Sequence, residues 1–140
     1  MITLDQAKLM VSVACEKGRE LGLKPLSVAV LDAGGHLLAF EREDGASPGR
    51  FEIARGKAYG AVMLGMPGSA QMTRAEDQAY FMAAMNGAFA GKVVPVPGGV
   101  LVKDASGDVL GAVGVTGDTS DNDARAAVAG IEAAGFVAVD

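Results

Sequence analysis

Residues 26–42 read LSVAVLDAGGHLLAFER, which is the pattern of a β-hairpin. Residues 26–32 and 37–42 are rich in the aliphatic and β-branched side chains that favour strands. The four residues between them, AGGH, include two glycines, which adopt the positive φ angles that a tight turn requires. The stretch therefore predicts two antiparallel strands joined by a short turn, and it places the only histidine of the chain, His36, in that turn.

Helices are predicted on both sides of this hairpin. Before it, Thr3 and Gln6 have the spacing of a capping box, and apolar residues at helical spacing follow up to Leu21. Gly22 and Pro25 end this first helix. After the hairpin, two more helices are expected over residues 51–65 and 73–86, ended by the breakers GMPG and Asn86-Gly87.

The last third of the chain predicts three strands and a helix. The strands are expected over residues 93–96, 100–103 and 109–116, with turn residues between them, as in a meander. The polar run 118–123 then supplies capping residues and first-turn acids for a helix that stops at Gly135.

The expected element order is therefore α-ββ-αα-βββ-α. Strands that are grouped, and do not alternate singly with helices, favour an α+β fold with an antiparallel sheet covered by helices. A length of 140 residues fits one domain, residues 1–140, and half of the residues are hydrophobic, which suffices for a core without disulfides.

Composition excludes several classes of protein. The formal net charge of −5 argues against nucleic-acid binding and against an acidic membrane surface, because both require clustered basic residues. No apolar run approaches the roughly 18 residues that span a bilayer, and the first five residues lack the basic start of a signal peptide. One cysteine, Cys15, excludes an intrachain disulfide and suits a reducing compartment. We therefore expect a soluble, cytoplasmic protein with a small-molecule ligand.

Few residues in the chain have the chemistry of a functional site. No GxGxxG, P-loop, GxSxG or HExxH motif occurs. His36 is either a solvated turn residue or an axial metal ligand or proton donor, since a single imidazole can hold haem iron from one side. Four methionines are either second axial ligands or core residues: Met66, Met72, Met82 and Met85.

Basic residues concentrate only around the start of the second helix. Arg42, Arg50, Arg55 and Lys57 are candidates for an anion site, with Lys57 beside an apolar helix face that would lower its pKa. The alternative is that they form surface ion pairs with the acidic residues among them. Glycines in two later loops, Gly98-Gly99 and Gly114 to Gly117, would let the backbone approach a ligand closely.

Several of these motifs, taken in order, resemble one known family. They are residues 28–42, the Asp44-Gly45-Ala46 turn, Lys57-Ala58-Tyr59, Gly65-Met66-Pro67, Pro97-Gly98-Gly99-Val100 and residues 111–117. Together they resemble the GlcG/HbpS haem-binding (haem-degrading domain) family, which also includes the C-terminal domain of PduO-type cobalamin adenosyltransferases. The resemblance covers nearly the whole chain.

The resemblance implies a five-stranded antiparallel, profilin-like sheet and a homo-oligomer. It also implies a pocket, because these residues match the shared pattern of the family: Asp32, Arg42, Lys57, Gly98, Gly99, Gly114, Thr116 and Gly117. The chain departs from that pattern at Gly60 and Asp118, where the family often has a hydroxyl residue and a second small residue.

Three functions remain open at this point. The first is a cytoplasmic protein that binds haem or a related tetrapyrrole or corrinoid, with His36 or a methionine as the iron ligand and Arg42 and Lys57 holding the propionates. The second is a small catabolic enzyme, an isomerase, hydratase or decarboxylase, in which Arg42 clamps a carboxylated metabolite and Lys57 serves as acid or base. The third is an accessory oligomer without catalysis.

Overall fold

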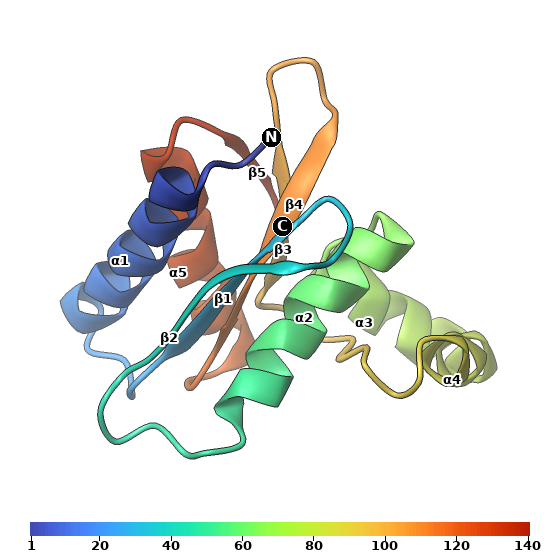
Figure 1. Cartoon of the computed structure of the whole chain (residues 1–140). Coiled ribbons are helices and arrows are strands. Elements are labelled where there is room, and N and C mark those ends of the chain that lie inside the picture. Colours follow the sequence, from blue (N-terminus) through green and yellow to red (C-terminus); the bar gives the residue numbers. More distant parts are fainter.

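The computed structural model describes residues 1–140, which form five helices and five strands (Figure 1). In chain order these are α1 (Leu4–Glu20), β1 (Ser27–Asp32), β2 (Leu37–Arg42), α2 (Arg50–Leu64), α3 (Gly68–Asp77), α4 (Ala79–Ala88), β3 (Gly99–Lys103), β4 (Val109–Thr116), α5 (Ser120–Ala133) and β5 (Val137–Val139). None of the helices combines the length and hydropathy that a membrane crossing demands.

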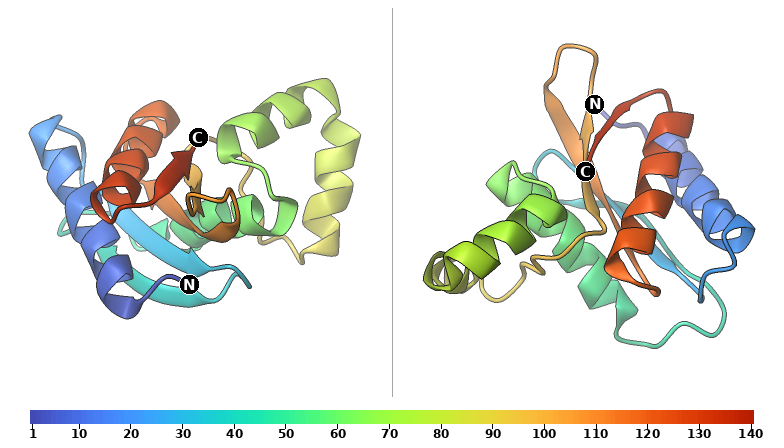
Figure 2. Two further views of the ribbon diagram at one scale, coloured as in Figure 1. Left: turned by 90° about the horizontal axis from the view of Figure 1, so that it is seen from above. Right: turned by 180° about the vertical axis from the view of Figure 1, so that it is seen from behind.

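All five strands pair antiparallel in one sheet, in the order β2-β1-β4-β3-β5. Helices α1 and α5 cover one face, while α2 covers the other and carries α3 and α4 beyond it (Figure 2). Successive side chains of a strand point to opposite faces, so Val28 and Val30 join the core under α1 and α5, and Leu31 joins the core under α2. The predicted α+β class with a five-stranded antiparallel sheet is confirmed.

The local signals around the hairpin are confirmed as well. The Thr3 backbone N–H donates to Gln6 Oε1 at 2.9 Å and the Gln6 N–H donates to Thr3 Oγ1 at 3.1 Å, so the capping box starts α1. Strands β1 and β2 pair from Ser27 opposite Arg42 to Leu31 opposite Leu37. The turn between them therefore lies where the two glycines predict it.

One predicted strand is wrong. Residues 93–96 belong to no strand: the segment includes Pro95, and its Val94 N–H donates to the Gly56 carbonyl of α2 at 3.2 Å, so this segment lies against α2. A proline has no N–H for a sheet ladder. The fifth strand is instead β5, which follows the last helix and pairs with β3.

Where the sequence predicts one helix over residues 73–86, the structure has two, α3 and α4. The helical segment begins earlier than expected, at Gly68, and it breaks at Gln78, whose φ of −139° and ψ of 66° are not helical. The resulting arm of α3 and α4 stands away from the sheet (Figures 1 and 2).

Glycines allow α2 to lie directly on the sheet. A Cβ on Gly114 would overlap the Ala54 carbonyl, and a Cβ on Gly99 would overlap the Lys57 carbonyl. Two glycines that the sequence suggested for ligand contact thus face a helix backbone. Their closeness fixes α2, and with it every α2 side chain that borders the hairpin turn.

Candidate functional site

The β1–β2 turn holds His36 through the carboxylate of Asp32. Asp32 Oδ1 accepts hydrogen bonds from the Gly34 and His36 N–H groups, each at 2.9 Å, and it lies 3.3 Å from His36 Nδ1. The bond from the His36 N–H is the main reason why the pKa of Asp32 lies below its ordinary value. The imidazole itself is 81% exposed. The turn therefore presents an imidazole to its surroundings next to an ionised carboxylate.

A hollow of about 460 Å³ lies between this turn and α2. Its walls include His36 and Leu37 from the hairpin and Phe51, Arg55 and Tyr59 from α2. Lys92, from the segment after α4, completes it. The hollow thus combines one imidazole, two aromatic rings and two cations.

The two cations of this hollow lie against its aromatic rings. The Arg55 guanidinium carbon is 5.9 Å from the centre of the Phe51 ring, and Lys92 Nζ is 5.6 Å from the centre of the Tyr59 ring. Arg55 Nη2 lies 3.3 Å from Glu52 Oε2, but its buried Nε has no hydrogen-bond partner. A buried N–H without a partner is costly. The Arg55 side chain is 31% exposed, and a guanidinium at the wall of a hollow is suited to an anion.

His36 also borders a second hollow, of about 320 Å³, on the opposite face of the sheet. Its other walls are mainly apolar and include Ile2, Leu38 and Leu110. Neither Arg55 nor Lys92 reaches it. The two hollows differ in the side chains that they offer a ligand, because Leu37 and Leu38 point to opposite faces of β2.

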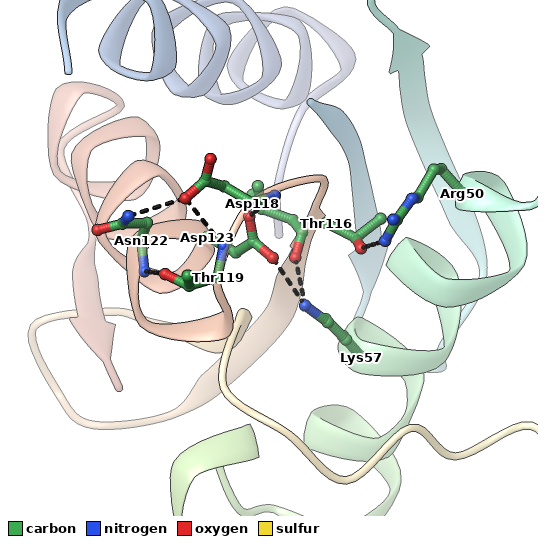
Figure 3. Close-up of polar contacts among 8 residues, drawn as sticks. Arg50, Lys57, Thr116, Asp118, Thr119, Asn122 and Asp123 are labelled. Atoms are coloured by element: carbon green, nitrogen blue, oxygen red, sulfur yellow. Dashed lines mark hydrogen bonds and ion pairs between the residues drawn. The ribbon is translucent and has the colours of Figure 1, made fainter. Parts of the chain in front are cut away.

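Lys57 lies elsewhere, in a buried ion pair (Figure 3). Its Nζ donates to Asp123 Oδ2 and to the Val115 carbonyl, both at 3.0 Å, and the side chains of Lys57 and Asp123 are 3% and 1% exposed. Burial is the main cause that lowers the pKa of Lys57 and raises that of Asp123. The expected lowering of the Lys57 pKa is confirmed, but its ammonium has protein partners and ties α2 to the start of α5.

The polar residues around this ion pair also contact one another (Figure 3). Arg50 Nη1 donates to Thr116 Oγ1 at 2.9 Å. The Asp118 N–H donates to Asp123 Oδ1 at 2.9 Å, and Thr119 caps α5 by accepting from the Asn122 N–H. Asp118 and Asp123 thus act at the start of α5, as the capping interpretation expects.

The predicted pocket residues are divided among several places. Arg42 is exposed at the far end of β2, in a hollow of about 440 Å³ that also contains Arg19 and Glu43. Six residue steps separate it from His36, about 20 Å along a strand. A Cβ on Gly98 would meet Lys57 Nζ at 2.9 Å, and one on Gly117 would overlap the Pro25 carbonyl.

Sequence reasoning missed the aromatic part of the hollow beside His36. Phe51, Arg55 and Tyr59 follow each other at intervals of four, which places them on one face of a helix, and this spacing is visible in the sequence. Lys92 carries no such signal. None of the four candidate methionines lines either hollow beside His36.

A small α+β domain with an open hollow beside its first hairpin is therefore the class that fold and site define. The chain belongs to the family of HbpS-like haem degrading proteins, whose model matches residues 2–132. This confirms the resemblance seen in the sequence.

Individual relatives cover most of the chain. An uncharacterised 15.0 kDa protein from the dhaT-dhaS intergenic region of Citrobacter freundii is 33% identical over 122 residues, 87% of this chain and 84% of that protein. A double mutant of Streptomyces reticuli HbpS is 30% identical, with a TM-score of 0.80 over 94% of this chain and 85% of that one. A PduOC:heme complex, at 22% identity, has the same fold: its TM-score is 0.86, and 99% and 98% of the two chains are covered.

Proposed function

We propose that this protein binds haem in the hollow between the β1–β2 turn and α2, where His36 would hold the iron. The observation that carries the proposal is the composition of that hollow, where an imidazole, two aromatic rings and two cations meet. Haem is a flat apolar ring with two carboxylates and an iron that accepts imidazole nitrogen. Bound there, it would supply a redox-active iron.

The side chains of the hollow suit the separate parts of haem. Phe51 and Tyr59 offer rings against which a flat macrocycle packs. Arg55, whose buried Nε has no partner, and Lys92 offer the positive charge that propionates require. The family match and the heme complex of a protein with the same fold support this choice of ligand.

The propionates are assigned to Arg55 and Lys92, in place of Arg42 and Lys57. Arg42 is at the other end of β2 and outside this hollow, and the Lys57 ammonium already has two protein acceptors. The same two facts leave the enzyme alternative without support, since a carboxylate clamp at Arg42 and an acid or base at Lys57 share no cavity.

A haem titration of the purified protein, followed by absorbance, tests the proposal. We expect a saturable Soret shift that His36→Ala abolishes and that Arg55→Gln with Lys92→Gln weakens. Arg42→Gln is the matched control, because it removes one positive charge outside the hollow and should leave the titration unchanged. Unchanged binding by His36→Ala, or equal losses in the control, would refute this site.

We further propose that the protein acts in the cytoplasm and as a homo-oligomer. The single, buried Cys15 is consistent with a reducing compartment, and the resemblance to the family suggests the oligomer. Cell fractionation and light scattering at several protein concentrations test these two points separately.

A further inference from the structure

The two hairpin turns of the sheet have the same construction. In the β1–β2 turn, Asp32 donates its N–H to the His36 carbonyl at 2.9 Å and accepts from the Gly35 N–H at 3.0 Å. In the β3–β4 turn, Asp104 donates to the Asp108 carbonyl at 3.1 Å and accepts from the Gly107 N–H at 3.0 Å.

The side chains of the two aspartates also bind alike. Asp104 Oδ1 accepts from the N–H groups two and four residues later, Ser106 and Asp108, each at 2.9 Å, as Asp32 Oδ1 does in its own turn. The central glycines both have positive φ, 80° at Gly35 and 90° at Gly107. The β3–β4 turn has the same backbone without a histidine, so it serves as an internal reference for the β1–β2 turn.

Two positions then distinguish the first turn from the second. The residue four places after the aspartate is His36 in one turn and Asp108 in the other. The residue two places after it is Gly34 in one and Ser106 in the other, so the backbone accepts a side chain there. At Gly34 a Cβ would lie 2.9 Å from both Cε1 and Nδ1 of His36, so the missing side chain makes room for the imidazole.

We propose that Asp32 and Gly34 are positioning residues for His36: together they seat the imidazole with Nδ1 beside the carboxylate and leave Nε2 free to bind a metal. The carboxylate 3.3 Å from Nδ1 favours the tautomer with the proton on Nδ1. Histidines that bind metals commonly present their second ring nitrogen to a carboxylate in this way, which fixes the ring and increases the basicity of the ligand. That iron is the metal rests on the proposed function.

The positioning of His36 by Asp32 and Gly34 can be tested without haem, by NMR of the apo-protein labelled with ¹⁵N in histidine. The chain contains one histidine, so its ring signals need no assignment. We expect the wild type to hold its proton on Nδ1 and Asp32→Asn to lose this preference. Asp104→Asn removes the same carboxylate charge from the same kind of turn and should leave the His36 signals unchanged.

The second readout uses the haem-bound protein. Asp32→Asn should raise the reduction potential, because a less basic imidazole stabilises ferric iron less, and should weaken haem binding about 10- to 100-fold. Gly34→Ser should also weaken binding, because its side chain takes the place of the ring, while Asp104→Asn should change neither quantity.

Two results would overturn the proposed positioning of His36. One is an Asp32→Asn protein whose His36 tautomer equals that of the wild type, and the other is an Asp104→Asn protein whose His36 tautomer changes as much as in Asp32→Asn. If the His36 tautomer responds to Asp32→Asn as expected but haem does not bind, the proposed function fails and the positioning role of Asp32 remains. If haem binds through His36 but Asp32→Asn changes neither the His36 tautomer nor the reduction potential, the positioning role fails and the proposed function remains.

Discussion

Replacing Lys57 by methionine should cost the protein about 4 kcal/mol of stability. Methionine keeps most of the apolar stem but leaves Asp123 buried without its ammonium partner. Removal of one partner from a buried ion pair costs about 3–5 kcal/mol, because the remaining charge stays out of water.

The geometry supports a value in the middle of that range. Two unit charges 3.0 Å apart, the Lys57–Asp123 distance, attract by about 5–6 kcal/mol at an effective dielectric constant of about 20. The hydrogen bond to the Val115 carbonyl adds to this loss, whereas release of the lysine from its own burial offsets part of it. For a domain of 140 residues the net cost corresponds to a decrease in Tm of roughly 10–15 °C.

The loss should depend on pH in a definite direction. Burial already raises the pKa of Asp123, and without Lys57 it should rise further above the ordinary value of about 3.9. Between the ordinary and the raised pKa, the native state binds more protons than the unfolded state, so stability falls as pH rises through this window. Lys57→Met should therefore be closer to the wild type at pH 5 than at pH 8.

Urea unfolding followed by circular dichroism at both pH values measures these effects. Lys17→Met is the matched control, since Lys17 and Glu20 form an ion pair with side chains 31% and 69% exposed, and should change stability by less than about 0.5 kcal/mol. Adding Asp123→Leu to Lys57→Met should restore much of the loss. A loss below about 1 kcal/mol at pH 8, or one without pH dependence, would refute the reasoning.

Three further predictions concern packing, capping and reactivity. Gly114→Ala should destabilise by about 1–3 kcal/mol in urea, because its Cβ would overlap the Ala54 carbonyl and push α2 off the sheet; an unchanged midpoint would contradict this packing. Thr3→Ala should cost about 1 kcal/mol by loss of the α1 cap, whereas a similar loss from Thr73→Ala, at a position inside α3, would speak against a capping effect. Burial raises the pKa of Cys15 to about 11, so at pH 8 iodoacetamide should label the native protein, as measured by mass spectrometry, at least about tenfold more slowly than the unfolded chain.

Much of the fold follows from short-range signals. The paired glycines of the first turn and the capping box at Thr3 act within a few residues, so the sequence alone predicts the hairpin and the start of α1. Residues 93–96 show the limit of such signals, since the valines of this segment favour a strand, whereas the Val94 N–H binds the Gly56 carbonyl of α2. The choice between them depends on where α2 lies.

The position of β5 depends on the same kind of long-range contact. It has three residues, too few for an alternating pattern to be recognised, and it becomes a strand because Leu101 and Lys103 of β3 offer a free edge opposite Val139 and Val137. That edge exists only once the rest of the sheet has formed. A sequence pattern therefore predicts the number of strands more easily than the identity of the last one.

Helix geometry explains why the basic residues predicted for one anion site lie in different places. Arg55 and Lys57 lie two residues apart in the sequence. Two residues along a helix correspond to a rotation of about 200°, so their side chains leave α2 on opposite sides. Lys57 points toward the sheet and α5 and meets Asp123, while Arg55 faces the hairpin turn and shares its side with Tyr59. A cluster of basic residues in a sequence thus predicts an anion site only when their spacing places them on one face of the helix or strand that carries them. Here the spacing of four residues places Arg55 beside Tyr59 on the hollow and leaves Lys57 outside it.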